Sequence, residues 1–149
     1  MGIRDRNGLP YDPLKPRIQV ALVDDFLLTR EALIEAIAVA DGSIDCLPFS
    51  TPAECARHLS WKFDAIVYYY RECRDGNLDD IAALRMSFPK TPVVVLCHID
   101  MHKLGVLKAA VGRADLNCTV LRPRTMADLL KSLPRPQTVL IATNQNFPK

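Results

Sequence analysis

Residues 18–25 read Ile-Gln-Val-Ala-Leu-Val-Asp-Asp, a short apolar run that ends in two adjacent aspartates. Only Gln19 interrupts the run, so both faces of the segment are apolar. Such a run is typical of a parallel strand that is buried between two layers of helices. The strand is expected to stop at Asp24, which leaves Asp24 and Asp25 together at its carboxyl end.

The segment that follows, residues 28–40, has the pattern of an amphipathic helix. Its apolar residues recur at intervals of three and four, while Arg30, Glu31 and Glu35 occupy the other face. The predicted inward face consists of Leu28, Ala32, Leu33, Ala36, Ile37 and Ala40.

Strand and helix patterns then alternate along the rest of the chain. The further predicted strands are residues 44–49, 65–70, 93–97 and 118–121. The predicted helices after them are residues 52–59, 78–85, 100–111 and 125–133. Strands joined by helical crossovers must pair in parallel, so the pattern predicts an α/β fold with a doubly wound, five-stranded parallel sheet of flavodoxin-like type. In such a sheet the functional site lies at the carboxyl ends of the strands.

The chain is expected to form one domain with two short extensions. Residues 1–17 hold three prolines and two glycines without an apolar stretch, so they are predicted to be an irregular lead and not a signal peptide. Residues 18–133 form the predicted domain, and residues 134–149 form a tail or linker. No run approaches the roughly 18 apolar residues of a membrane helix, and the five scattered cysteines suit a reducing cytoplasm.

This order of segments resembles the receiver domain of two-component response regulators. The resemblance spans residues 18–133 and rests on residues 20–25, 63–67, 91–96 and 121–123. It implies that the acid pair Asp24 and Asp25 corresponds to the Mg²⁺ ligands of that family. It also implies a phosphoacceptor aspartate after the third strand, a Ser or Thr after the fourth and a Lys before Pro after the fifth. Only the acid pair is retained here.

Four positions of the implied phosphorylation site carry other residues. Tyr69 stands at the acceptor position, and a phenol with a pKa of about 10 is neither a carboxylate nucleophile nor a good Mg²⁺ ligand at neutral pH. Cys97 replaces the hydroxyl residue, Arg122 replaces the Lys, and Thr119 replaces the aromatic residue that reports the switch. Phosphorylation is therefore not expected.

The acid pair has two alternative roles. Asp24 and Asp25 either end the strand and cap the next helix, as inherited architecture, or still bind Mg²⁺. Two adjacent carboxylates without a cation repel each other, so Arg122 is predicted to form an ion pair with one of them. Tyr68 and Tyr70 are expected to point to the opposite face of the sheet from Tyr69.

A metal- or thiol-redox-responsive switch on the same fold is the alternative function. Cys97, His98 and His102 lie close in sequence as candidate ligands of a soft metal, with the two histidines one helical turn apart. Cys73 and Cys97 are the candidate redox pair. A buried thiol beside a helix start with two exposed histidines explains the same residues without a metal.

The charge is unevenly distributed. Residues 101–149 hold eight Lys and Arg residues against two Asp. We expect a phosphorylation-independent protein-interaction module of signal transduction or transcription regulation, without enzymatic activity or a required cofactor. A protein partner or a second copy is expected to bind between Asp100 and Leu133, whereas nucleic acid would need a separate output domain. The expected contacts, where exposed, are Leu104, Leu107, Ala127 and Leu130, with Lys103, Lys108, Arg124 and Lys131 as the charged rim.

Overall fold

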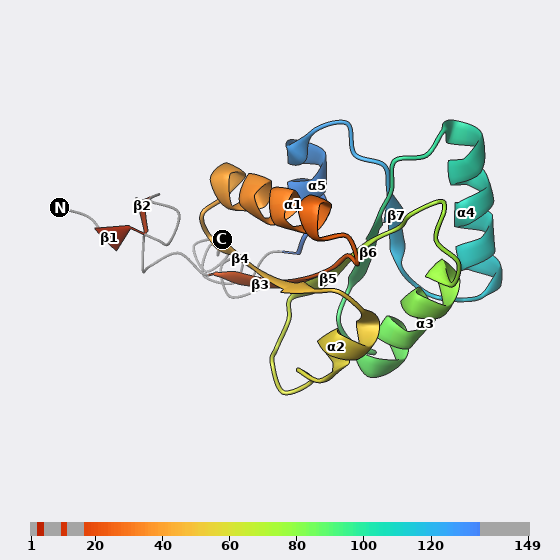
Figure 1. Cartoon of the computed structure of the whole chain (residues 1–149), viewed down its shortest axis with the longest axis horizontal. Coiled ribbons are helices and arrows are strands. Elements are labelled where there is room, and N and C mark those ends of the chain that lie inside the picture. Colours follow the sequence, from red (N-terminus) through yellow and green to blue (C-terminus); the bar gives the residue numbers. More distant parts are fainter. Residues whose placement is uncertain (1–2, 5–9, 12–16, 135–149) are drawn as a thin grey trace, which may run out of the picture.

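The computed structural model describes residues 3–4, 10–11 and 17–134 of the chain. Five parallel strands form one sheet in the order β4-β3-β5-β6-β7 (Figure 1). The strands are β3 (Ile18–Val23), β4 (Ile44–Phe49), β5 (Ala65–Tyr69), β6 (Val93–Leu96) and β7 (Thr119–Leu121). The predicted doubly wound parallel sheet is confirmed, and its order brings the carboxyl ends of β3, β5 and β6 side by side.

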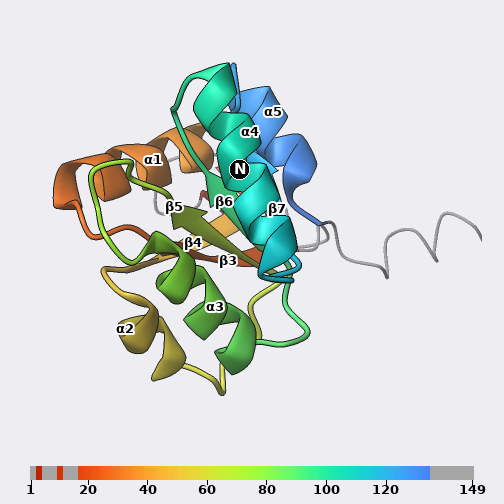
Figure 2. The same ribbon diagram turned by 90° about the vertical axis from the view of Figure 1, so that its right-hand side faces the viewer.

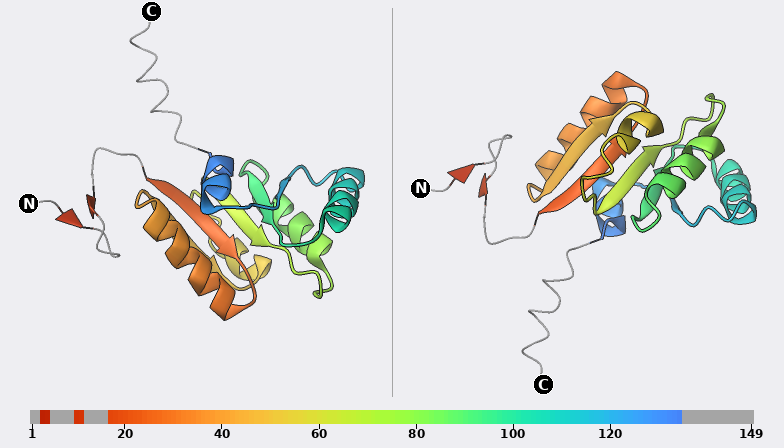
Figure 3. Two further views of the ribbon diagram at one scale, coloured as in Figure 1. Left: turned by 90° about the horizontal axis from the view of Figure 1, so that it is seen from above. Right: turned by 90° about the horizontal axis from the view of Figure 1, so that it is seen from below.

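Helices cover both faces of this sheet. They are α1 (Leu27–Ala40), α2 (Pro52–Ala56), α3 (Asn77–Ser87), α4 (Met101–Arg113) and α5 (Met126–Ser132). Helices α1 and α5 lie on one face and α2 and α3 on the other (Figures 1 and 2). Helix α4 stands at the β7 end of the sheet, away from α1 and α2 (Figure 3).

Side-chain caps fix the starts of three helices. Thr51 accepts a hydrogen bond from the backbone N–H of Glu54, and Pro52 occupies the first helical position of α2. Asp100 caps α4 in the same way. Thr125 forms a reciprocal capping box with the third residue of α5. These starts agree with the predicted helices to within one residue.

Two predicted strands end one residue earlier in the structure. Tyr70 and Cys97 lie just beyond β5 and β6, yet each still donates a backbone hydrogen bond to the neighbouring strand, at 2.8 Å to Leu96 and 3.1 Å to Leu121. The hydrogen bonds between neighbouring strands therefore continue for one residue beyond the ends of β5 and β6.

The predicted inward face of α1 is partly wrong. Leu28 is 72% exposed, and Ala32, Ala36 and Ala40 are exposed as well. The residues that pack against the sheet and α5 are Leu33, Ile34 and Ile37, and Ala38 is buried as well. Apolar residues occur almost all the way round this helix, so the three-and-four spacing could not single out the buried face.

The two ends of the chain are described only in part. Ile3–Arg4 pairs with Pro10–Tyr11 as a short antiparallel ladder inside the lead that was expected to be irregular. The tail expected from residue 134 lies outside the described residues beyond Pro134. No helix in the described ranges combines the length and apolarity needed to cross a membrane.

Candidate functional site

The predicted site residues from β3, β5 and β6 meet at the carboxyl edge of the sheet. Asp24 follows β3 and is only 2% exposed, whereas Asp25 beside it is exposed. Tyr69 is the last residue of β5 and is half-buried, and Cys97 after β6 is fully buried. The phenol of Tyr69 lies close enough to Asp24 and Cys97 for their charges to affect its pKa.

Two arginines from the loop between β5 and α3 neutralise the acid pair. Arg71 donates from Nη2 to Oδ1 of Asp24 at 2.6 Å and from Nε to Oδ1 of Asp25 at 3.3 Å. Arg74 donates from Nη1 to Oδ2 of Asp25 at 2.6 Å. Each carboxylate therefore has a guanidinium partner, and Arg71 bridges the two.

The prediction that Arg122 pairs with the acid pair is wrong. The guanidinium of Arg122 contacts Sδ of Met101 at 3.6 Å, and Arg71 and Arg74 hold both carboxylates instead. Arg71 and Arg74 lie in the loop between β5 and α3, at the same edge of the sheet as the acid pair, and their nearness in sequence to the end of β5 is the one signal that pointed to them.

Asp24 has a donor on each carboxylate oxygen. Its Oδ1 also accepts from the backbone N–H of Phe26 at 3.1 Å, and its Oδ2 accepts from the hydroxyl of Thr29 at 2.6 Å. Arg71 donates to that same hydroxyl oxygen. Burial acts to lower the pKa of Arg71, but the hydrogen bond and the charge of Asp24 outweigh it and raise that pKa. The arrangement is a charged, hydrogen-bonded cluster in which both oxygens of the buried Asp24 carboxylate have donors from the chain itself.

A second set of hydrogen bonds fixes the loop that carries the arginines. Arg74 donates to Oδ2 of Asp80 at 2.7 Å, and the hydroxyl of Tyr68 donates to the same oxygen at 2.8 Å. The buried side chain of Asn77 donates to the backbone carbonyls of Arg71 and Arg74 at 2.8 and 2.7 Å. Burial and the hydrogen bond to Asp80 raise the pKa of Tyr68, so it stays a donor at neutral pH.

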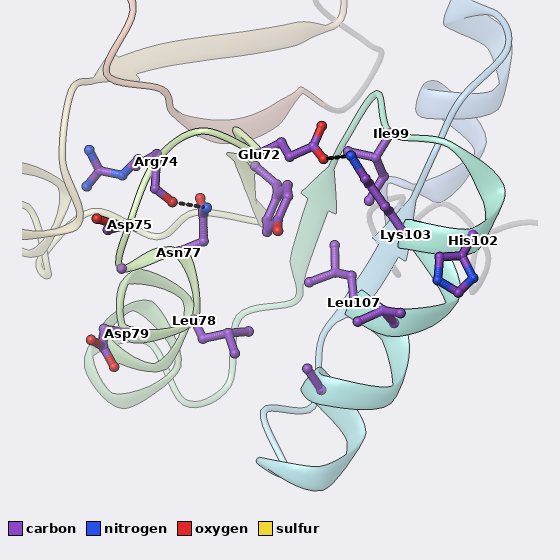
Figure 4. Close-up of a pocket in the computed structure, with 14 residues that line it drawn as sticks. Glu72, Arg74, Asp75, Asn77, Leu78, Asp79, Ile99, His102, Lys103 and Leu107 are labelled. Carbon is purple, nitrogen blue, oxygen red and sulfur yellow. Dashed lines mark hydrogen bonds and ion pairs between the residues drawn. The ribbon is translucent and has the colours of Figure 1, made fainter.

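An ion pair joins this loop to α4. The ammonium group of Lys103 on α4 contacts the carboxylate of Glu72, and Figure 4 shows the two side chains meeting between the loop and the helix. Both side chains are about half exposed, so the pair itself adds little stability. It nevertheless places α4 next to the loop that holds the acid pair.

Tyr69 fills the acceptor position as a packing residue. It contacts the core on the α1 and α5 face, and the guanidinium carbon of Arg71 lies 4.6 Å from the centre of its ring. Tyr68 packs in the core on the opposite face, as strand alternation predicts. Burial raises the pKa of Tyr69, so its phenol is protonated at neutral pH and is a hydrogen-bond donor, not a nucleophile.

Cys97 and His98 also lie at this edge, and the ring centres of His98 and Tyr69 are 6.0 Å apart. Cys97 donates from Sγ to the carbonyl of Leu121 at 3.6 Å, and burial raises the pKa of its thiol. Cys73, His98 and His102 are exposed, and Thr119 is exposed on β7. Among the described residues no group of three or more His, Cys, Asp or Glu could hold a metal ion. The metal-responsive form of the alternative function therefore gains no support from the described residues.

The sequence matches no family model and no curated protein sequence. Solved structures do resemble the fold. The chemotaxis protein CheY4 of Vibrio cholerae has a TM-score of 0.58 at 20% identity, over 78% of this chain and 95% of that chain. A response regulator receiver protein of Pseudomonas putida has a TM-score of 0.58 at 23% identity, over 79% and 96%. The response regulator TrrA of Thermotoga maritima, in complex with Mg²⁺ and BeF, has a TM-score of 0.58 at 14% identity, over 76% and 94%.

These likenesses establish that the chain has the receiver fold. They span nearly the whole length of each receiver structure, and they agree with the order of strands in the sheet. Fold alone does not assign a function, so the chemistry of this site has to be argued from the residues of this chain.

Proposed function

We propose that this chain is a phosphorylation-independent receiver-like module that works by binding another protein or a second copy of itself in signal transduction or transcriptional regulation. The observation that carries the proposal is the bridge from Arg71 to Asp24 and Asp25. The guanidinium of Arg71 binds the two carboxylates that would bind the metal ion in a receiver of the usual kind.

The residue at the phosphoacceptor position supports the proposal that the module works without phosphorylation. Formation of an aspartyl phosphate requires a carboxylate at the end of β5, where this chain has the protonated phenol of Tyr69. The neighbouring thiol of Cys97 is a weak donor and bonds to a backbone carbonyl. We therefore expect no phosphoryl transfer and no enzymatic step at this edge.

The state of the two carboxylates that would bind Mg²⁺ also supports phosphorylation independence. Mg²⁺ requires oxygen ligands in near-octahedral geometry and is bound through carboxylates in such sites. Asp24 and Asp25 already have arginine partners, and the third carboxylate is replaced by Tyr69. The donor set of this edge does not fit Mg²⁺, so the module is expected to need no metal.

The proposed partner surface comprises α4, β7 and α5, between Asp100 and Leu133. Leu104 and Leu107 are buried there and drop out of the expected contacts, whereas Ala127 is exposed and Val106 is 55% exposed. The charged rim of Lys103, Lys108, Arg124 and Lys131 is exposed. An acidic surface fits such a rim, whether it belongs to another protein or to a different face of a second copy.

The test is to add beryllofluoride with Mg²⁺ while the partner surface is monitored. We expect no change in backbone amide NMR shifts around Tyr69 and α4, and the same association state in sedimentation with and without the additive. The matched control is a receiver domain with an intact acceptor aspartate under identical conditions. Saturable shifts at the carboxyl edge, or association that depends on the additive, would contradict the proposal.

A further inference from the structure

A cavity lies between α1 and α5, beside the carboxyl edge of the sheet. Its volume is about 390 Å³, within the range of small-molecule sites. The core residues Leu33, Leu96 and Leu129 form apolar walls, and Met126 adds a flexible one. Figures 1 and 2 show α1 and α5 together on this face of the sheet. The cavity is separate from the arginine and aspartate cluster, although Tyr69 and Thr29 border both.

The exposed side of α1 contributes to this cavity. Ala32 and Ala36 line it, and both are exposed although they are apolar. Leu28, one turn before Ala32, is 72% exposed. These residues belong to the face of α1 that the sequence pattern predicted to be buried, and in the structure they are exposed. Their small side chains at two successive turns leave room between α1 and α5 that larger residues would fill.

Arg124 is the charged residue of the cavity lining. His98 lines the cavity as well, and none of the lining residues is an Asp or a Glu. The guanidinium of Arg124 has no hydrogen bond or ion pair with any residue in the described part of the chain, and it is exposed. Tyr69 and Thr125, which carry hydroxyl groups, also line the space. An apolar cavity with an unpaired cation at its rim is complementary to an apolar molecule that carries one negative charge.

We propose that this cavity binds a small amphipathic carboxylate, with its apolar ring or chain between α1 and α5 and its carboxylate group at Arg124. The concave shape favours a small molecule over a helix of a partner protein. The inference goes beyond the proposed interaction role, because it assigns a small-molecule ligand to a cavity that shares α5 and Arg124 with the proposed partner surface.

The test uses three probes with one ring system and different charges. These are 1-naphthaleneacetate, its neutral amide and 1-naphthylmethylamine, each titrated into the full chain while ¹H–¹⁵N shifts are recorded. We expect saturable shifts in residues 29–36 and 123–129. The carboxylate should bind roughly five- to tenfold more tightly than the amide, since it alone gains a charge-assisted bond to Arg124. The amine should bind most weakly.

Two exposed substitutions separate the charge from the cavity. Arg124→Gln should abolish the preference for the carboxylate over the amide, whereas Arg113→Gln on α4 removes the same charge elsewhere and should retain it. Ala36→Phe should fill the cavity and abolish binding of all three probes, whereas Ala83→Phe on the exposed side of α3 should not. Equal affinities for the three probes, shifts that map to α3 and α4, no binding at all, or an unchanged preference in Arg124→Gln would each overturn the proposal.

Discussion

Replacement of Arg71 by Met is the most direct perturbation of this site, because it removes the charge and keeps an apolar chain of similar length. In the wild-type chain the carboxylate of Asp24 has no exposed surface and its ion pair with Arg71 is 2.6 Å long. Breaking a buried ion pair from one side costs about 3–5 kcal/mol. Thr29 and the backbone of Phe26 continue to donate to Asp24. We therefore expect a loss of about 2–4 kcal/mol in the free energy of unfolding.

The chain offers a matched control for this experiment. Arg17 and Asp45 form an ion pair of the same 2.6 Å length, but their side chains are 25% and 29% exposed. Arg17→Met should cost about 1 kcal/mol or less, because water solvates the carboxylate that remains. The two pairs have the same shortest distance but differ in the burial of the carboxylate, which is 0% exposed in Asp24 and 29% exposed in Asp45.

Urea denaturation followed by circular dichroism measures both variants. The double variant with Arg71→Met and Asp24→Asn should recover about half of the loss, since it removes the uncompensated charge together with its partner. Equal costs for Arg71→Met and Arg17→Met, or no recovery in the double variant, would refute the view that Arg71 neutralises a buried charge.

Three further outcomes are expected. Tyr69→Asp alone should give no mass increase after incubation with a small phosphodonor and Mg²⁺, since Arg71 still occupies the acid pair; a stoichiometric adduct in intact-mass spectra would contradict this. Lys108→Glu combined with Lys131→Glu should weaken association and reduce its salt dependence in sedimentation experiments while circular dichroism stays unchanged, and an unaltered association constant would exclude this face. Iodoacetamide at neutral pH should modify the exposed Cys73 well before Cys97, because burial raises the pKa of the Cys97 thiol, and peptide mapping that finds the reverse order would contradict the structure.

The strands were predictable because their signal is local. Residues 18–23 form a short apolar run, residues 44–49 form a weaker one that Asp45 interrupts, and the structure reproduces the bounds of both. The face of α1 was not predictable in the same way, since apolar residues surround that helix and only tertiary packing selects Ile37 and Ala38 for the core. Helix starts were readable where a side chain caps the backbone, as at Thr51 and Thr125.

The partner of the acid pair was the part of the site that the sequence did not reveal. Arg122 was a reasonable candidate, because it ends a strand of the same sheet and replaces a lysine of the family that the chain resembles. The contact depends instead on how the loop after β5 folds back over β3. The path of this loop is fixed by hydrogen bonds from Asn77 to two loop carbonyls and by the left-handed backbone of Gly76, which has a φ of 85°. No periodic pattern encodes such a loop.

The cation that binds the acid pair in this chain is the side chain of Arg71, which, unlike a metal ion, does not dissociate from the protein. Where a metal ion and a phosphoryl group come and go, their binding energies can shift the population of two loop states. We expect Arg71, whose guanidinium is part of the loop itself, to hold that loop in one state through Asp24 and Asp25, and the ion pair of Glu72 and Lys103 connects the loop to α4. On the proposed function, control then has to come from a different ligand. The cavity between α1 and α5 borders Tyr69 and Thr29, and this makes it the site from which a bound molecule would reach the cluster.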